Sequence, residues 1–238
     1  YFHLPPPERW YAFDLGPVHV LALDYHFERA AHEQFAFAQQ DLRTSRAPWK
    51  VVFLHVPMFN VGGHGSTWGH DAYLPLFHET HVDLVVAGHS HVYERFRPVA
   101  PRSVDPVWPI VHITSGGGGA SLYPVYDHPA LASRASANHF IVFEATADRL
   151  KGRACLPSGK TLDRFELRKP PDGLASESAA PADPASASDR ISRPARCTSR
   201  SGEAPRNDAP PLRKRKRWQS GATAACAAAS SVILRLSA

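Results

Sequence analysis

Three histidines stand at the ends of two apolar segments, and their side chains could bind metal ions. His89 and His91 lie in the segment GHSHVYER directly after the apolar run 82–87, and His55 follows the apolar run 50–54. Both runs read as buried strands. Open α/β sheets place ligands at the carboxyl ends of their strands, and neutral imidazole is a good ligand for zinc, iron and related metals. The three histidines are therefore predicted to converge on a metal site.

The spacing of His89 and His91 leaves two arrangements open. Residues i and i+2 of an extended segment point the same way, whereas a loop that bends at Ser90 would direct the two imidazoles at two adjacent ions. Each histidine alone could also be an ordinary polar residue at the end of a strand. The recurrence of histidine at the ends of two successive strands favours the metal site.

Hydrophobic periodicity predicts the elements that position these histidines. Strands are expected at 10–15, 18–24, 50–55, 82–87, 108–115, 139–146, 149–156 and 161–168, and helices at 29–43 and 72–80. Gly16-Pro17 reads as the turn of a hairpin. The expected fold is mixed α/β, with two packed sheets and helices outside them.

The composition of the chain changes near Pro170. Residues 1–169 hold 16 Lys/Arg, 16 Asp/Glu and all 14 histidines, so residues 170–238 carry the whole net charge of +5. The second segment is rich in Ala, Ser, Pro and Arg, and it has too few large apolar residues to offset its ordering entropy. We expect one domain at 1–169 and a disordered basic tail at 170–238.

Two features of the tail bear on possible partners. The basic run 213–217 beside Trp218 could bind nucleic acid or an anionic membrane, or act as a targeting address. A solvated charge run is favoured instead, so no nucleic-acid partner is expected. The mildly apolar stretch 222–236 is too short to span a bilayer.

An ordered set of motifs resembles a known family. LHVP at 54–57, GHSHVYER at 88–95 and ITSGGGGASLYPV at 113–125 resemble the calcineurin-like metallophosphoesterases, and the Tyr-Glu-Arg extension looks most like the purple acid phosphatase branch. The resemblance covers about residues 1–169. It implies the carboxyl-terminal half of a metallophosphoesterase β-sandwich flanked by helices. It also implies hydrolysis of phosphate monoesters, as small-molecule substrates, by water activated between two metal ions (Fe, Zn or Mn).

The same resemblance implies roles for individual histidines. His55 and His89 would bind one ion, and His91 would bind the other. His64, nine positions after His55, would be the catalytic and substrate-binding histidine that contacts phosphate or protonates the leaving group. An exposed loop histidine in a Gly-rich stretch is the alternative for His64.

The residues after the second histidine have two interpretations. Tyr93 and Glu94 are expected to support the ligand loop from behind. Arg95 could bind a substrate phosphate bidentately, or it could brace the loop, which the need to aim two ligands accurately favours. The glycines 116–119 lack the lysine of a nucleotide-binding loop, so a close approach of backbone beside the metal edge is expected there.

The chain also departs from the pattern of the family. Two of the segments from which family members take their other ligands, GDxxD/Y and GNHE, do not occur in it. The nearest resemblance to the third, DxH, is Asp24-Tyr25-His26, but the context of Asp24, at the end of the strand expected at 18–24, matches a later strand of the family. Three neutral imidazoles supply no negative charge to offset the repulsion between two cations. We therefore expect the chain to correspond to the carboxyl-terminal half of a catalytic domain, to hold at most one ion weakly and to hydrolyse phosphate esters poorly.

Other functions and several properties are left open by the sequence. A metallophosphodiesterase acting on nucleotides or phospholipids is one alternative, and a non-catalytic fragment or binding module is another. Neither the identity of the metal nor the localisation is fixed, although the resemblance is compatible with secretion or export.

Overall fold

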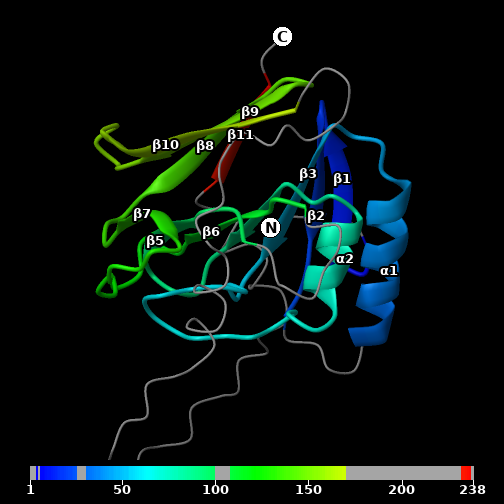
Figure 1. Cartoon of the computed structure of the whole chain (residues 1–238), viewed down its shortest axis with the longest axis horizontal. Coiled ribbons are helices and arrows are strands. Elements are labelled where there is room, and N and C mark those ends of the chain that lie inside the picture. The colour runs from blue at the N-terminus through cyan, green and yellow to red at the C-terminus, as the bar shows by residue number, and fades with distance from the viewer. Residues whose placement is uncertain (1–3, 5, 26–30, 100–107, 170–231, 237–238) are drawn as a thin grey trace, which may run out of the picture.

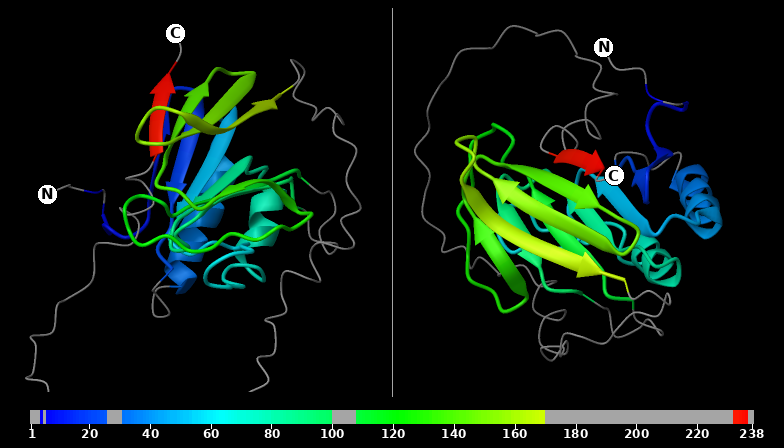
Figure 2. Two further views of the ribbon diagram at one scale, coloured as in Figure 1. Left: turned by 90° about the vertical axis from the view of Figure 1, so that its left-hand side faces the viewer. Right: turned by 90° about the horizontal axis from the view of Figure 1, so that it is seen from above.

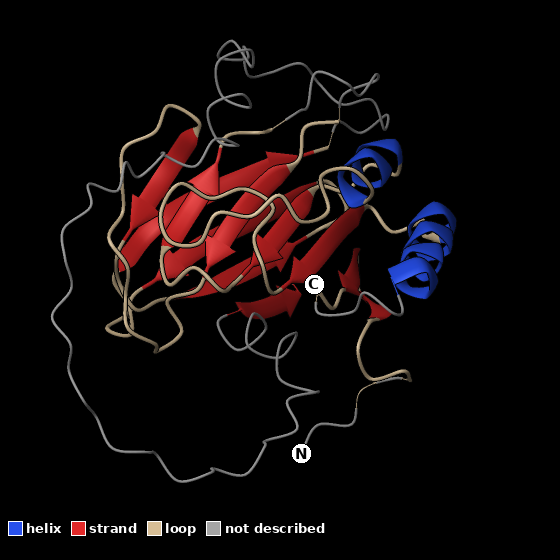
Figure 3. Ribbon diagram, turned by 90° about the horizontal axis from the view of Figure 1, so that it is seen from below, coloured by secondary structure: helices blue, strands red, loops and turns tan. Residues whose placement is uncertain are grey.

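Two β-sheets pack face to face, and two helices lie along the outer face of the larger sheet (Figure 1, Figure 2). The computed structural model describes residues 4, 6–25, 31–99, 108–169 and 232–236. The helices are α1 (Ala31–Thr44) and α2 (Tyr73–Glu79). Both lie on the same side of the molecule in the view from below (Figure 3).

The larger sheet has seven strands in the order β1-β2-β3-β4-β6-β5-β7. Strands β2, β3, β4 and β6 run parallel to one another, whereas β1, β5 and β7 pair antiparallel. The seven strands are β1 (Tyr11–Leu15), β2 (Val18–Ala22), β3 (Trp49–Leu54), β4 (Leu84–Ala87), β5 (Tyr93–Phe96), β6 (Val111–Ser115) and β7 (Leu131–Ala135).

The smaller sheet has four strands in the order β10-β9-β8-β11. Strands β8, β9 and β10 form an antiparallel meander, and β11 pairs parallel to β8. The four strands are β8 (Phe140–Ala145), β9 (Arg149–Cys155), β10 (Thr161–Arg168) and β11 (Val232–Leu236).

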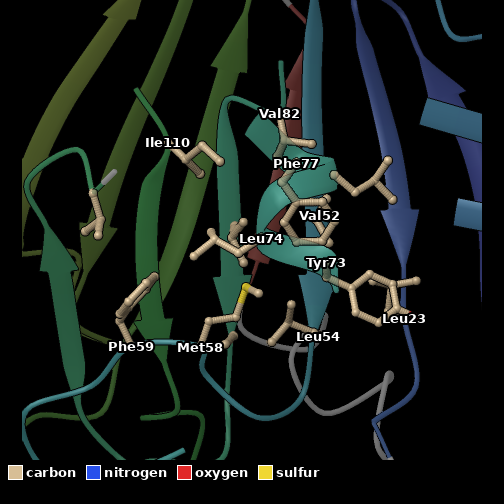
Figure 4. Packing of buried hydrophobic residues seen from close by; sticks show 14 of the residues in the cluster. Leu23, Val52, Leu54, Met58, Phe59, Tyr73, Leu74, Phe77, Val82 and Ile110 are labelled. Atoms are coloured by element: carbon tan, nitrogen blue, oxygen red, sulfur yellow. The ribbon is translucent and has the colours of Figure 1, made fainter. Parts of the chain in front are cut away.

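The central strands bury both of their faces, which explains why they read as continuous apolar runs. In β3, Val52 and Leu54 face the helices, and Val51 and Phe53 face the second sheet. The helix side is filled by side chains of α2, among them Phe77, and by the loop after β3 (Figure 4). Alternate residues of each strand thus join two separate cores, one on each face of the larger sheet.

The structure confirms most of the predicted elements. Both helices, the Gly16-Pro17 hairpin and the strands β1–β4, β6 and β8–β10 occur where the pattern placed them, with small shifts of their ends. Strand β6 begins at Val111 rather than Trp108, because Pro109 has no backbone N–H to donate and Ile110 forms only an isolated bridge to Val99.

Three strands were not predicted. Strands β5 and β7 are short and carry charged or small residues, so neither shows a clear apolar alternation. Strand β11 lies inside the segment expected to be disordered, and its backbone pairs with β8 from Val232↔Ile141 to Leu236↔Ala145. The prediction of disorder was therefore wrong for these five residues. The remainder of the tail up to 231, with the basic run 213–217, lies outside the described residues.

Candidate metal centre

His55 and His89 meet at the carboxyl edge of the larger sheet. Strands β3 and β4 pair in parallel up to Leu54↔Ala87, so the residues that follow them emerge side by side. The backbone N–H of Gly88 donates to the carbonyl of His55 at 3.0 Å, which extends this pairing beyond the strands. His55 Nε2 and His89 Nδ1 are 3.1 Å apart.

The backbone at His89 adopts a conformation that side chains rarely take. Its φ of 58° lies in the left-handed region, which costs a residue other than glycine roughly 1–2 kcal/mol. The conformation is held within a tight turn, in which Ser90 N–H donates to the Gly88 carbonyl at 2.7 Å. Unfavourable backbone of this kind clusters at functional sites, and here it accompanies the close approach of the His89 ring to His55.

His64, in the loop after β3, lies beside His89. The two ring centroids are 4.8 Å apart, and His64 Nε2 is 3.2 Å from the hydroxyl of Tyr123. The His64 side chain is exposed. The structure thus brings the predicted phosphate-contacting histidine next to one of the two predicted ligands.

His91 faces a different group from His89, in keeping with a loop that bends between them. Its Nδ1 donates to the Ser121 carbonyl at 2.8 Å, so in the neutral ring the lone pair is on Nε2. Its ring stacks on Tyr123, with centroids 4.5 Å apart and an interplanar angle of 19°. A backbone carbonyl on one ring nitrogen is the usual way to orient a histidine that binds metal through the other.

Glu94 supports a neighbouring loop from within the core. Its carboxylate is fully buried and accepts hydrogen bonds from the backbone N–H groups of Val61 (2.9 Å) and Gly62 (2.7 Å). Burial raises the pKa of Glu94, and these two hydrogen bonds oppose the rise. The geometry agrees with the expected supporting role.

Tyr93 and Arg95 both bind Asp163 of β10. The Tyr93 hydroxyl donates to Asp163 Oδ2 at 2.7 Å, and Arg95 Nε donates to the same atom at 2.7 Å. The Arg95 guanidinium also lies 5.0 Å over the Phe165 ring. Arg95 therefore joins the two sheets, the arrangement expected of a residue that braces the loop, and its contact with a substrate phosphate stays a prediction.

The glycine run allows the close approach that was expected of it. A Cβ on Gly116 would lie 2.0 Å from the carbonyl oxygen of Ser90, and one on Gly117 would lie 2.4 Å from His139 Nδ1. Only glycine lets these backbones pass so near the histidine loop.

The donor set fits one ion better than two. Two nitrogen ligands about 2.1 Å from one zinc ion lie roughly 3.0–3.4 Å apart, and the 3.1 Å between His55 Nε2 and His89 Nδ1 matches this separation. Within the described ranges, no group of three or more His, Cys, Asp or Glu side chains is placed to hold a metal ion. The imidazole pair therefore does not complete a centre by itself, and a second ion would need further ligands.

Several residues at the site carried no signal in the sequence. Tyr123 contacts both His64 and His91, and Tyr25 lies with its ring 5.9 Å from that of His55. Ser90 was noted only as the bend between two histidines. Tyr123 could have been singled out, because it lies in the motif at 113–125, but its partners are distant in sequence.

Comparisons with known proteins show which family the segment around these histidines is similar to. The family model described as calcineurin-like phosphoesterase matches residues 9–93, which include β3, β4 and four of the residues discussed above, His55, His64, His89 and His91. Residues 9–93 are thus similar to the calcineurin-like phosphoesterases. The fold agrees: a purple acid phosphatase from yellow lupin (Lupinus luteus) seeds aligns over 76% of this chain and 37% of its own, with a TM-score of 0.61 and 20% identity.

Sequence relatives point to one branch of the calcineurin-like phosphoesterases. The chain is 36% identical over 118 residues to purple acid phosphatase 21 of Arabidopsis thaliana, an alignment that covers 46% of this chain and 26% of that protein. It is 30% identical over 145 residues to acid phosphatase A of Cryphonectria parasitica, covering 49% and 29%. The chain thus spans between a quarter and a third of the length of these curated relatives. No helix among the described residues is long and apolar enough to cross a membrane.

Proposed function

We propose that this chain supplies the imidazole ligands and the phosphate-facing histidine of a metal-dependent hydrolase of phosphate monoesters. The observation that carries the proposal is the 3.1 Å approach of His55 Nε2 to His89 Nδ1, with the His64 ring 4.8 Å from that of His89. His55 and His89 would hold one ion, and His91 would hold a second where further ligands complete the centre. A bound ion polarises the phosphoryl group and activates water.

His64 and Tyr123 are the groups of this chain that face the substrate in this proposal. His64 can donate a proton to the departing oxygen. The Tyr123 hydroxyl, 3.2 Å from His64 Nε2, holds the ring in place and can exchange partners with an incoming phosphate oxygen. Tyr123 would thus orient His64 and at the same time cover one face of His91.

A second candidate function is a non-catalytic module that binds one metal ion. The observation that favours it is the small donor set, since the described residues include no group of three or more His, Cys, Asp or Glu side chains that could hold a metal ion. Activity on two substrates separates the candidates: p-nitrophenyl phosphate reports monoester hydrolysis, and bis(p-nitrophenyl) phosphate reports diester hydrolysis. A zinc-binding chain inert towards both would be the non-catalytic module.

Metal stoichiometry after dialysis tests the centre itself. We expect at most one weakly held zinc ion per chain, with affinity falling by about tenfold or more in His55→Ala and in His89→Ala, because each change removes one of two imidazole ligands. His32→Ala, an exposed position on α1, is the matched control and should bind as the parent does. Equal binding by all four proteins would overturn the site, and two tightly bound ions would contradict the single-ion expectation.

A further inference from the structure

The segment 60–64, which carries His64, is fastened to the histidine loop through one hydroxyl. Ser90 Oγ accepts a hydrogen bond from the backbone N–H of His64 at 3.2 Å and another from Asn60 Nδ2 at 3.1 Å. Ser90 is completely buried. The residue between the two candidate ligands therefore binds both ends of the neighbouring segment.

The middle of the same segment is bound by Glu94. The backbone N–H groups of Val61 and Gly62 donate to its two carboxylate oxygens at 2.9 Å and 2.7 Å. Hydrogen bonds to a carboxylate are shorter and stronger than those between neutral groups, and these two are shielded from water by the burial of Glu94. Three of the backbone N–H groups between 61 and 64 are thus bound by side chains of the segment 90–94.

Packing leaves this segment little room to move. A Cβ on Gly62 would lie 2.8 Å from the Pro124 carbonyl oxygen and 3.2 Å from Glu94 Oε1. A Cβ on Gly63, which has a φ of +82°, would lie 2.8 Å from Ser90 Oγ. The two glycines let the chain pass between the histidine loop and the segment around 124. Beyond His64 the crowding ends, because a Cβ on Gly65 would meet nothing within 4 Å.

We propose that Ser90 and Glu94 are positioning residues that set the place of His64 relative to the His55–His89 pair. Two groups that must act on one phosphate have to keep a fixed separation, and here the peptide that presents the ligands also holds the peptide that presents His64. Any shift of the histidine loop therefore carries His64 with it. The role of His64 towards phosphate rests on the proposed function. The distance between the His64 and His89 rings, however, can be measured without any assay of activity.

Nuclear Overhauser effects between the ring protons of His64 and His89 give the direct test. The parent should show cross-peaks, because the ring centroids are 4.8 Å apart. We expect the cross-peaks to weaken strongly in Ser90→Ala and in Glu94→Gln. Ser66→Ala is the matched control: Ser66 lies in the same loop, and its Oγ accepts only from Trp68 N–H at 3.0 Å, so its loss should leave the cross-peaks unchanged. Unchanged cross-peaks in both Ser90→Ala and Glu94→Gln, with the sheet amide shifts intact, would overturn the inference.

Two binding measurements separate this inference from the proposed function. Zinc affinity should stay within about twofold of the parent in Ser90→Ala, whereas inorganic phosphate added to the zinc-supplemented chain should bind about tenfold more weakly. Phosphate binding by His64→Ala should be weakened as much as by the double variant His64→Ala/Ser90→Ala, because both act through one imidazole. Additive losses would overturn the positioning role. A parent that binds no phosphate would instead count against the proposed function, while the cross-peaks still decide the inference.

Discussion

Asp163 shows how one carboxylate joins the histidine loop to the opposite sheet. It accepts from the Tyr93 hydroxyl and from Arg95 Nε and Nη2, and the side chains of Arg95 and Asp163 are only 17% and 10% exposed. Breaking a buried charge pair on one side leaves the other charge uncompensated. The pair therefore links β5, which follows the candidate ligands, to β10 of the smaller sheet.

Replacing Asp163 should cost much more stability than replacing an exposed aspartate. We expect Asp163→Asn to lower the free energy of unfolding by about 3 kcal/mol in urea titrations. Asp127→Asn is the control, because Asp127 pairs with Arg134 at the surface with its side chain 87% exposed, and it should cost less than about 1 kcal/mol. Equally small losses of unfolding free energy in the two variants would show that the Arg95–Asp163 pair does not contribute to stability.

At the scale of single residues, sequence spacing could predict the candidate ligands but not the residues that support them. His55 and His89 were predicted to converge because each directly follows an apolar run that reads as a strand. Asp163 lies 68 residues from Arg95 along the chain, and only the register of β10 against the rest of the sandwich brings the two together. A pattern within one segment carries no information on such a partner.

At the scale of elements, α2 and β6 bury histidines that do no chemistry. His78 of α2 and His112 of β6 are both inaccessible to solvent, and burial lowers the pKa of each, that of His112 to about 3. His19 of β2 behaves in the opposite way: burial opposes its charge, but the carboxylates of Asp41 and Asp14 at 2.6 and 2.7 Å outweigh burial and raise its pKa.

These shifts predict a loss of stability in mild acid that His112 helps to cause. Between the folded pKa of His112, about 3, and its ordinary pKa of 6.5, the unfolded state binds the extra proton, so stability falls as the pH drops below 6.5. From pH 7.5 to 5.5 we expect the parent to lose about 1.4 kcal/mol more than His112→Leu, measured by urea unfolding at both values. The raised pKa of His19 adds stability that is lost only as the pH rises, so it does not mimic this effect. His32→Leu on α1 should follow the parent, and a parallel loss in His112→Leu would contradict the assignment.

Apolar periodicity identified the elements with many buried residues. It missed the segments that become strands only because they pair with an adjacent strand. Both helices and the parallel strands of the larger sheet repeat apolar residues at regular spacing. Strand β5 reads YERF and β7 reads LASRA, and each becomes a strand because an adjacent strand offers its edge. Glu94, interpreted from the sequence as a supporting residue, lies in a strand that the pattern did not predict and accepts hydrogen bonds from the backbone of Val61 and Gly62.

On the scale of the whole molecule, the sandwich includes a strand from far along the chain. Strand β11 pairs in parallel with the edge of β8, more than 60 residues after β10 ends. On the facing sheet the edge strand β1 leaves Phe13 44% exposed beside Tyr11, with which its ring stacks. The sequence did not reveal β11, because its five residues hardly change the average composition of residues 170–238. That average is polar, and it predicted disorder for the whole segment.

A proline within β11 should release the edge of β8. Proline cannot donate to a ladder and is confined to strand edges or bulges, so we expect Leu234→Pro to increase hydrogen exchange of β8 amides by at least about tenfold. An uncovered edge also invites pairing between chains, so self-association on a sizing column should accompany the faster exchange. Ser237→Pro lies just past the strand and should change neither measurement. Identical exchange in the two variants would show that β11 does not protect β8.

The crowding around the glycines also determines which positions evolution and laboratory selection can explore. Positions 62, 63, 116 and 117 have no space for even a methyl group without moving a neighbour, whereas Gly65, the next residue after His64, faces open space. Of these glycine positions near the histidines, only position 65, on the carboxyl-terminal side of His64, can therefore accept a side chain without displacing a neighbour. A library that randomises Gly65 can vary the surface beside His64 without displacing a neighbour, while one that randomises Gly116 displaces the backbone of the histidine loop.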